Sequence, residues 1–327
     1  MQTDLDRLVD SARTTLKIAL LGSVVNDTVR PFGGGEVRGL GGLTYTIVQM
    51  ALLAPEDWHI YPVCRIGSDI AQRFFALLNQ FPNVHPDHVL VEDRENTRVT
   101  LVYESPSERN EYTTEPMAPL TFRELEPVLD AQIALVNFIT GKDVFLDALQ
   151  RFSQESDALL YMDFHSLALG IGPDGLRYYR RPPDWHHFVR IPHVLQMNER
   201  EARCLAQKDL PSFEALAAFG LQLLGELGER PFVVNLTLDG EGSLLCWQDD
   251  EPKWRHIPAQ QVKAVDPTGC GDSFAAGFIR KYWETGDPLA AARFANLVAG
   301  LKCTVHGADN LAELRPLMQT AVRMDTT

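Results

Sequence analysis

The stretch "QVKAVDPTGCGDSFAAGFIRKYW" (residues 261–283) joins a strand-like run, a glycine turn and a helical pattern. A Pro-Thr pair ends the run "QVKAV", and "DSFAAGFIRKYW" continues with helical spacing. Between them, Gly269, Cys270 and Gly271 allow successive backbone N–H groups to turn toward one point. Such a turn at a helix N-terminus favours an anion, because free N–H donors meet the positive end of the helix dipole. The alternative is that Asp272 is only a favourable acidic residue in the first helical turn, worth under about 1 kcal/mol.

Short apolar runs alternate with amphipathic segments along the chain. The runs lack strict alternation, which suits strands covered on both faces, as in a parallel sheet. They are "KIALLG" (17–22), "IALVNFI" (133–139), "ALLYMDF" (158–164), "HVLQMN" (193–198) and "PFVVNLTL" (231–238). Helical patterns include 143–152, 212–228 and 287–303. This rhythm predicts an α/β fold with a doubly wound, mainly parallel sheet.

Two segments break the rhythm. Residues 30–42 are too rich in glycine for a helix, and residues 97–113 show the Thr, Val and Tyr content of exposed strands, with a turn at Pro106. Together they predict a small β flap, or lid, over one end of the sheet. Because the chain has no internal repeat and no low-complexity linker, we expect a single domain over residues 1–327 with the lid segments inserted.

The composition excludes several classes of partner. The chain carries 30 basic and 44 acidic residues, a formal charge of −14, whereas binding to nucleic acid or to an anionic membrane depends on clustered Lys and Arg. No apolar run reaches the roughly 18 residues of a membrane helix. The N-terminal "MQTDLDRLVD" lacks the features of a signal peptide, and the five cysteines show no CxxC or metal-ligand spacing. We therefore expect a cytoplasmic protein with reduced thiols, without nucleic-acid or membrane partners.

Polar residues follow several of the predicted strands, where ligands bind in open parallel sheets. They are Asp27, Asp163, Asn198 and Thr237. Each alone is also a common turn or helix-cap residue. Competing motifs are absent: the chain has no GxxxxGK[ST], no GxGxxG after the first strand, no GxSxG, and no HExxH or HxxxH pair. The anion-binding turn therefore remains as the candidate chemical centre.

The segment "AVDPTGCGDSFAAGF" (264–278) resembles the C-terminal signature of the ribokinase-like (PfkB) carbohydrate kinases. Five further segments resemble elements of this family in the family's order. They are "GSVVNDTV" (22–29), "GLGGLTYTIVQMALL" (39–53), "CRIGSDIAQRFFALL" (64–78), "MDFHS" (162–166) and "MNEREARCL" (197–205). Several elements in the right order are much harder to obtain by chance than one loop, so the resemblance covers nearly the whole chain.

The resemblance implies a role for each matching residue. Asp272 would be the catalytic base, and the N–H groups of Gly269, Cys270 and Gly271 would form the anion hole for the transferred phosphoryl group. An ordinary Asp is a weak base, but a largely dissociative transition state needs the base mainly to orient the hydroxyl. The substrate-binding residues would be Asp27, Gly41, Gly42, Thr46 and Asp163.

The resemblance also implies a nucleotide side and cations. The residues on the ATP side would be Asn198, Glu201, Thr237, Gly242 and Asn296. Asn198 and Glu201 would position Mg²⁺ through water, which suits a cation that keeps much of its hydration shell. The alternative for this pair is an exposed, charged first helical turn. Asp266 and the carbonyl of Thr268 resemble positions that hold a monovalent cation, such as K⁺, in some members of the family.

Four residues depart from the family pattern. Thr46 and His165 each stand where the family usually has Asn, and Asp239 stands where the nucleotide turn often has Gly. Cys270 stands where the anion hole usually has Ala or Gly. At a helix N-terminus the pKa of its thiol would fall and make it sensitive to oxidation, whereas the alternative is an inert small residue.

We therefore expect an ATP-dependent kinase that phosphorylates a hydroxymethyl group of a sugar or nucleoside, with closure of the lid and a homodimer formed through it. A sugar-phosphate kinase of the same family would need a basic residue at the substrate end, and a nucleoside kinase would use aromatic stacking. The candidates are Arg38, Arg65, Arg98 and Arg109 for the former, and Phe32, Tyr103 and Tyr112 for the latter. A non-catalytic sugar or nucleotide sensor remains an alternative. A nucleotide-dependent oxidoreductase comes last, because the first strand lacks the glycine fingerprint.

Overall fold

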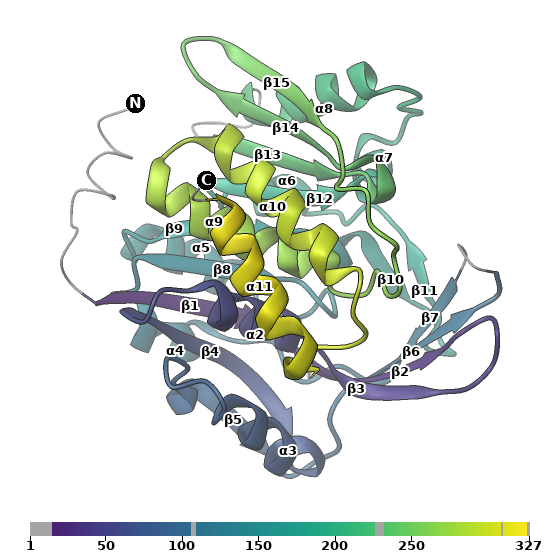
Figure 1. Ribbon diagram of the computed structural model, residues 1–327. Coiled ribbons are helices and arrows are strands. Elements are labelled where there is room, and N and C mark those ends of the chain that lie inside the picture. Colours follow the sequence, from purple (N-terminus) through teal and green to yellow (C-terminus); the bar gives the residue numbers. More distant parts are fainter. Residues whose placement is uncertain (1–14, 106–108, 226–231, 309, 326–327) are drawn as a thin grey trace.

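The computed structural model describes residues 15–105, 109–225, 232–308 and 310–325. The expectation about the N-terminal ten residues and the predicted turn at Pro106 lie outside these ranges. Figure 1 shows one large sheet with helices on both faces. Its strand order is β15 (Pro252–Ile257), β14 (Ser243–Gln248), β13 (Val233–Thr237), β12 (Val194–Asn198), β9 (Leu159–Asp163), β8 (Ile133–Asn137), β1 (Leu16–Gly22), β4 (Trp58–Gly67) and β5 (Val89–Glu92).

The strands from β13 to β5 run parallel, and β14 and β15 add an antiparallel edge. Successive residues of β1 enter the two different halves of the core. Ile18 and Leu20 pack with one cluster, and Ala19 and Leu21 with the other. Every one of these side chains is buried. Burial on both faces is the reason that the strand sequences read as continuous apolar runs.

Helices cover both faces of the sheet, which confirms the predicted doubly wound α/β fold. One face is covered by α2 (Leu43–Leu53), α3 (Ser68–Leu78), α9 (Cys270–Thr285), α10 (Pro288–Lys302) and α11 (Leu311–Asp325). The other is covered by α4 (Phe122–Leu125), α5 (Leu146–Glu155), α6 (Trp185–Val189), α7 (Glu199–Ala206) and α8 (Phe213–Gly225). The part of the predicted helix beyond Gly225 lies outside the described residues. Within those residues, no helix combines the length and the apolar character needed to cross a membrane.

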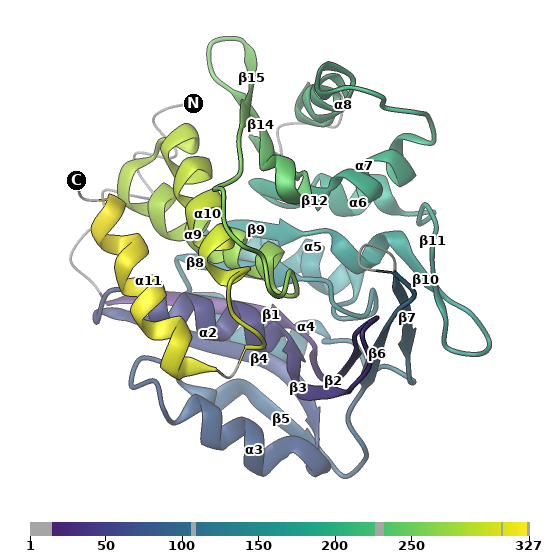
Figure 2. The same cartoon turned by 45° about the vertical axis from the view of Figure 1, so that its right-hand side comes forward.

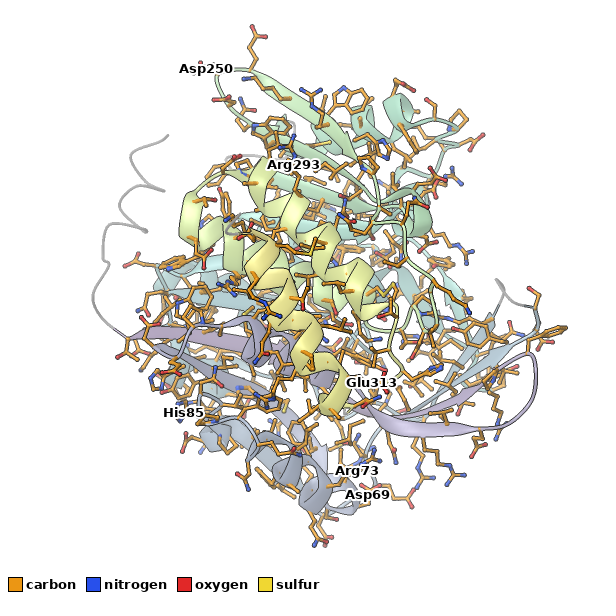
Figure 3. The ribbon with its side chains drawn as sticks, viewed as in Figure 1. Asp69, Arg73, His85, Asp250, Arg293 and Glu313 are labelled. Atoms are coloured by element: carbon orange, nitrogen blue, oxygen red, sulfur yellow. A yellow bond between two sulfur atoms is a disulfide. The ribbon has the colours of Figure 1, made fainter. Side chains whose placement is uncertain are left out.

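The outermost helices show the expected two-sided pattern. On α10, Arg293 is exposed and its neighbour Phe294 is buried. On α11, Glu313 is exposed and Leu314 is buried. Figure 3 shows Arg293 and Glu313 on the outer surface of these helices. This alternation matches one apolar stripe facing the core and a polar face toward solvent.

A second sheet lies beside one end of the large sheet (Figure 2). Its order is β3 (Val37–Gly42), β2 (Val24–Arg30), β6 (Arg98–Tyr103) and β7 (Arg109–Thr113). Val25, Val99 and Leu101 pack on Ile139 beneath it. The hairpin of β10 (Leu169–Ile171) and β11 (Arg177–Tyr179) adjoins it through a bridge between Tyr112 and Leu176. The two segments predicted to form a flap therefore do lie in one small sheet, although its function as a lid remains a prediction.

The predicted strand "QVKAV" (261–265) is wrong. These residues are all exposed and have no regular secondary structure. The antiparallel strand β15 forms the edge of the sheet, and residues 261–265 leave this edge without pairing with it. Instead, the N–H groups of Val265 and Asp266 donate to the carbonyl of Cys303, at 2.7 and 3.0 Å.

Candidate active site

The glycine turn leads into α9 as predicted. Gly269 precedes the helix with a φ of 81°, in the left-handed region that favours glycine. A Cβ there would lie 2.2 Å from Cδ1 of Tyr45, so backbone and packing both require glycine. The N–H of Cys270 donates to the carbonyl of Pro267 at 3.2 Å. One of the three amides predicted for the anion hole is therefore engaged in the turn itself.

Asp272 lies in the first turn of α9, where two side chains orient its carboxylate. The hydroxyl of Thr46 donates to Oδ1 at 2.8 Å, and Nδ2 of Asn137 donates to the same oxygen at 2.5 Å. Burial raises the pKa of Asp272, while these hydrogen bonds and the charge of His165 oppose the rise. Thr46, predicted in the substrate pocket, thus contacts the predicted base. Asn137 was missed, although it ends a buried strand as Asp163 and Asn198 do.

Gln196 connects the sheet to the anion-binding turn. Its Nε2 donates to Oδ2 of Asp163 and to the carbonyl of Gly271, both at 3.1 Å. Its Oε1 accepts a hydrogen bond from the hydroxyl of Tyr161. Burial raises the pKa of Asp163 to about 8. Asp163, predicted to bind substrate, is therefore held beside the turn by a glutamine that the sequence analysis did not single out.

Asn198 and Glu201 form a reciprocal capping box at the start of α7. The N–H of Glu201 donates to Oδ1 of Asn198 at 2.9 Å, and Asn198 donates back to both oxygens of Glu201, through its N–H at 2.7 Å and its Nδ2 at 2.5 Å. Glu201 is only 2% exposed, so the alternative of an exposed helical turn is wrong for this residue.

His165 completes the environment of Glu201. Its Nδ1 lies 2.9 Å from Oε1 of Glu201. Burial alone lowers the pKa of His165, but the hydrogen bond to Glu201 and the charges of Asp163 and Glu111 raise it to about 9. The imidazolium thus balances part of the carboxylate charge here. Both oxygens of Glu201 already accept hydrogen bonds, which suits holding the waters of a cation better than binding it directly. In the described part of the chain, no three His, Cys, Asp or Glu side chains cluster as a metal site.

Asp27 lies in β2, directly over Gly41 of the neighbouring strand. A Cβ on Gly41 would lie 1.7 Å from Oδ2 of Asp27. Gly42 has a φ of 62°, and a Cβ there would lie 2.5 Å from the carbonyl of Ser23. Burial raises the pKa of Asp27 to about 8, and the charges of Glu111 and Asp272 add to the rise. The carboxyl group of Asp27 therefore occupies the space that a side chain at Gly41 would fill, whereas Gly42 is required by its own backbone angle and its contact with Ser23.

Glu111 and Arg177 form an ion pair that the sequence did not reveal. Arg177 Nη1 donates to Oε1 of Glu111 at 2.6 Å and to the carbonyl of Ile139 at 2.9 Å. The pair joins the small sheet to β11. Of the arginines considered from the sequence, Arg109 is the one whose charge acts on Asp27. The others pair with acidic residues: Arg38 with Glu36, Arg65 with Glu92 and Glu124, and Arg98 with Glu95.

The residues predicted for the nucleotide side follow β12 and β13, except Asn296, which lies on α10. Thr237 lies opposite Asn198 in the register of these strands. Gly242 has a φ of 95°, and a Cβ there would lie 2.1 Å from the carbonyl of Ile257. Asn296 donates to that same carbonyl at 2.8 Å, so its amide fixes the end of β15. Asp239 has a φ of 48°, which explains why the family often has glycine at this position.

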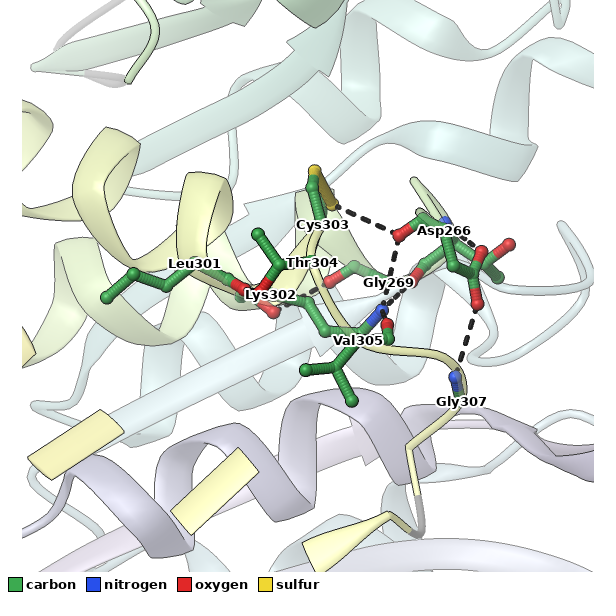
Figure 4. The surroundings of a disulfide bond; sticks show 11 residues. Asp266, Gly269, Leu301, Lys302, Cys303, Thr304, Val305 and Gly307 are labelled. Atoms are coloured by element: carbon green, nitrogen blue, oxygen red, sulfur yellow. Dashed lines mark hydrogen bonds between the residues drawn. A yellow bond between two sulfur atoms is a disulfide. The ribbon is translucent and has the colours of Figure 1, made fainter. Parts of the chain in front are cut away.

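The back of the turn is fastened by Asp266 and by a disulfide bond. Asp266 accepts from the N–H of Thr268 at 2.9 Å and of Gly307 at 3.2 Å. Cys270 and Cys303, 33 residues apart, are bonded (Figure 4). The expectation of five reduced thiols, with Cys270 reactive or inert, is therefore wrong for this pair. The cysteines meet because α10 packs antiparallel to α9, which brings its end to the start of α9.

Replacing Gly41 by Ala is expected to weaken binding of the phosphoryl acceptor. The new Cβ would displace the carboxyl of Asp27, and losing a hydrogen bond to a carboxyl group that holds its proton raises KM up to about 10-fold. Gly39→Ala is the matched control, because it lies in the same strand and a Cβ there meets nothing within 4 Å. Steady-state kinetics of both variants decide the role of Gly41, and equal KM values would contradict it.

Comparisons with known proteins give the family and the fold of this chain. Residues 60–314 match the profile of the family described as pfkB family carbohydrate kinase. A nucleoside kinase from Methanothermobacter thermautotrophicus is 46% identical over 76 residues, which are 23% of this chain and 23% of that protein. A deoxyribokinase from Salmonella typhi is 32% identical over 110 residues, or 34% of each chain. The matched segments thus span about a third or less of the length of these curated relatives.

The fold is shared over nearly the whole chain. A ribokinase from Giardia lamblia superposes with a TM-score of 0.75 at 17% identity, covering 95% of this chain and 99% of that one. A ribokinase from Arabidopsis thaliana, solved with ribose and ATP, superposes with a TM-score of 0.71 at 19% identity, covering 96% and 100%. These structures confirm the ribokinase-like fold. Because the profile match covers most of the sequence, the chain belongs to the pfkB family of carbohydrate kinases.

Proposed function

We propose that this protein is a kinase that transfers the terminal phosphoryl group of ATP to a hydroxymethyl group of a sugar or nucleoside. The observation that carries the proposal is the position of Asp272. Its partly buried carboxylate lies at the start of α9, three residues after Gly269, and is oriented by Thr46 and Asn137. Such a group can accept a proton from a hydroxyl while the helix N-terminus stabilises the transferred phosphoryl group.

The remaining residues take roles around this centre. Asp27 accepts hydrogen bonds from hydroxyls of the acceptor, and the absence of a side chain at Gly41 leaves room for its carboxyl group. The amides of Gly269 and Gly271 form the anion hole, since that of Cys270 is used in the turn. Burial raises the pKa of Asp272. A general base accepts a proton more readily when its pKa lies nearer the pH of the reaction, so this rise suits Asp272 to act as the base.

The nucleotide side faces Asn198 and Glu201. Thr237 ends β13, Gly242 lies in the turn before β14, and Asn296 lies on α10, and ATP would bind along them. Asn198 and Glu201 would hold Mg²⁺ through its waters, and the cation would neutralise charge on the phosphates. The hydrogen bonds among Asn198, Glu201 and His165 hold these side chains ready for that role.

The charge of the pocket favours a neutral acceptor over a sugar phosphate. Arg177 is already paired with Glu111, and the charge of Arg109 lowers the pKa of Asp27 less than burial and the neighbouring carboxylates raise it. Burial and neighbouring carboxylates raise the pKa of Asp27, which means that further negative charge nearby is unfavourable. A second phosphate would add such charge. We therefore infer a neutral sugar or nucleoside as substrate.

The small sheet would act as the lid, because β2 carries Asp27 and β7 carries Glu111. Closure excludes water, which otherwise competes as acceptor. Phe32 is 63% exposed and Val37 is 50% exposed on this sheet, and a homodimer through the lid would cover them. Light scattering of the purified protein tests the dimer.

A pH dependence of stability follows from Asp27. The pKa of its folded form is raised from 3.8 to about 8, so between these values the folded state holds a proton that the unfolded state releases. This contribution to stability is therefore lost as the pH rises toward 8. Asp27→Asn is expected to raise the free energy of unfolding at pH 8 by more than about 1 kcal/mol, with a smaller change at pH 5. Urea unfolding at both values measures this, and an equal change at both would contradict it.

The function is tested in two steps. Thermal shift with a non-hydrolysable ATP analogue, Mg²⁺ and a panel of sugars, nucleosides and sugar phosphates identifies ligands, since saturating ligand adds a few kcal/mol of stability, roughly. A coupled assay of ADP formation with the same panel then measures turnover. Acceptor-dependent ADP formation is expected with a neutral sugar or nucleoside. Folded protein that binds these ligands but forms no ADP would instead support the non-catalytic sensor.

A further inference from the structure

Lys302, the last residue of α10, is a buried lysine directly behind the anion-binding turn. Its side chain is 0% exposed. Its Nζ donates to three backbone carbonyl oxygens, those of Thr268 at 2.7 Å, Val305 at 3.1 Å and Asp266 at 3.5 Å (Figure 4). An ammonium group has three N–H donors. The three carbonyls therefore match its hydrogen-bonding capacity.

Two nearby carboxylates favour the charged form of this group. Burial lowers the pKa of Lys302, and the negative charges of Asp266 and Asp272 offset only part of this fall. The charge of Lys302 in turn helps to hold the pKa of Asp266 below its usual value, against the effect of burial. The ring of Tyr45 lies on a further side, with its centroid 5.6 Å from Nζ. The protonated form is the one that satisfies all three carbonyls.

A cage of carbonyl oxygens is the kind of ligand set that replaces the hydration shell of a monovalent cation. The resemblance to the family implied such a cation at Asp266 and the carbonyl of Thr268. Here that carbonyl accepts a hydrogen bond from Nζ at 2.7 Å. A second cation on the same oxygen would lie near the ammonium, where two unit charges about 4 Å apart repel by about 4 kcal/mol near a protein surface. The residues present therefore do not fit a K⁺ ion at this position.

We propose that Lys302 is a built-in replacement for the monovalent cation behind the anion hole, and that it makes the protein independent of K⁺. The inference rests on the proposed kinase function for its catalytic consequence. Lys302 does not line the reacting side of the turn, so it is a positioning residue. It acts through the backbone of the turn that would bind the phosphoryl group.

The geometry of the peptide bond explains how this works. In a trans peptide the C=O and the following N–H point in opposite directions. Because Nζ binds the carbonyl of Thr268 from behind, it directs the N–H of Gly269 to the opposite side of the turn. The carbonyl of Cys303, next to Lys302, accepts from the N–H groups of Val265 and Asp266, and the disulfide to Cys270 adds a covalent tie. These bonds on the neighbouring residue Cys303 fix the position of Lys302 relative to the turn.

The first test measures turnover in four chloride salts at equal ionic strength, with K⁺, NH₄⁺, Na⁺ or tetramethylammonium as the cation. Wild type is expected to show the same rate in all four. Lys302→Ala removes the ammonium and opens its position, so its rate in tetramethylammonium chloride is expected to fall about 100-fold, as for a lost oxyanion-hole interaction. K⁺ or NH₄⁺ is expected to restore much of this rate in a saturable manner. Lys281→Ala is the control, since Lys281 lies on α9 and pairs with Asp325.

The second test measures the Tm of the same proteins in the same salts, without nucleotide or acceptor. K⁺ is expected to raise the Tm of Lys302→Ala above its value in tetramethylammonium chloride, because a cation that binds only the folded state stabilises it. The Tm of wild type and of Lys281→Ala should show no such difference. This readout needs no turnover, so it decides the cation question even if the kinase assignment fails.

Two results would overturn the proposal. One is a wild-type rate or Tm that depends on K⁺ in a saturable way. The other is a folded Lys302→Ala protein that shows no response specific to K⁺ or NH₄⁺ in either readout. If Lys302→Ala does not fold in any salt, Lys302→Ser takes its place with the same expectations, because its short side chain also leaves the position of the ammonium open to a cation and keeps a polar group there.

Discussion

Replacing Asp272 by Asn is expected to lower kcat about 100- to 10,000-fold, the contribution of a positioned general base, with little change in the affinity for ATP. The amide keeps the shape of the carboxylate, and its oxygen can still accept from Thr46 and Asn137, which both contact Oδ1 in the structure. The variant therefore removes the proton acceptor without removing its supports. Kinetics with the identified acceptor and calorimetric titration with ATP measure the two quantities.

The stability of the same variant distinguishes the two interpretations of Asp272, as a catalytic base or only as a favourable acidic residue in the first turn of α9. Burial raises its pKa, so the ionised group costs stability, and Asp272→Asn should be at least as stable as wild type at pH 8. A residue that served only the helix dipole would instead lose up to about 1 kcal/mol. Asp147→Asn, in the first turn of α5, is the control for that effect and should leave kcat unchanged. Retention of more than a few per cent of activity, roughly, by Asp272→Asn would exclude it as the base.

Replacing Gly269 by Ala is the second change with a large expected effect. The methyl group would lie 2.2 Å from the ring of Tyr45, at a backbone φ of 81°. Relief of this contact has to move the turn, and an anion hole displaced by even about 1 Å can lose 100-fold in rate. We therefore expect kcat to fall by about two orders of magnitude, which steady-state kinetics would measure.

Gly286 provides an internal control at the other end of the same helix. It ends α9 with a φ of 65°, and a Cβ there meets nothing within 4 Å. Gly286→Ala therefore adds only the backbone cost of roughly 1–2 kcal/mol and should retain its activity. If both variants lose activity equally, backbone strain rather than the contact with Tyr45 accounts for the loss at Gly269.

Several parts of the fold were readable from the sequence because they depend on local patterns. The runs at 17–22 and 193–198 became central strands, since a strand covered on both faces must be apolar throughout. The glycine turn before Asp272 was equally local, since positive φ angles select glycine. The run "QVKAV" failed for the opposite reason. Its residues have strand character, but the end of the run bonds to the carbonyl of Cys303 after α10 and does not pair with the edge strand β15.

Other features of the site depend on residues far apart in the chain. Asn137 reaches Asp272 across 135 positions, and Gln196 reaches Gly271 across 75. Arg177 pairs with Glu111 because β11 adjoins β7. Asn, Gln and Arg residues occur throughout any sequence. Their residue type therefore did not indicate a role in the site until the structure showed which strands are neighbours.

The sequence by itself determined the family, the order of the elements and the turn that ends at Asp272. Each of these features depends on a short run of contiguous residues in which only a few residue types fit. Only the tertiary structure decided what lies behind that turn. It brings the end of α10 to the start of α9, which pairs Cys303 with Cys270 and places the ammonium of Lys302 on three backbone carbonyls. The physical reason is that backbone carbonyls are present at every residue. Which of them converge on one charge is therefore set by packing and not by residue type.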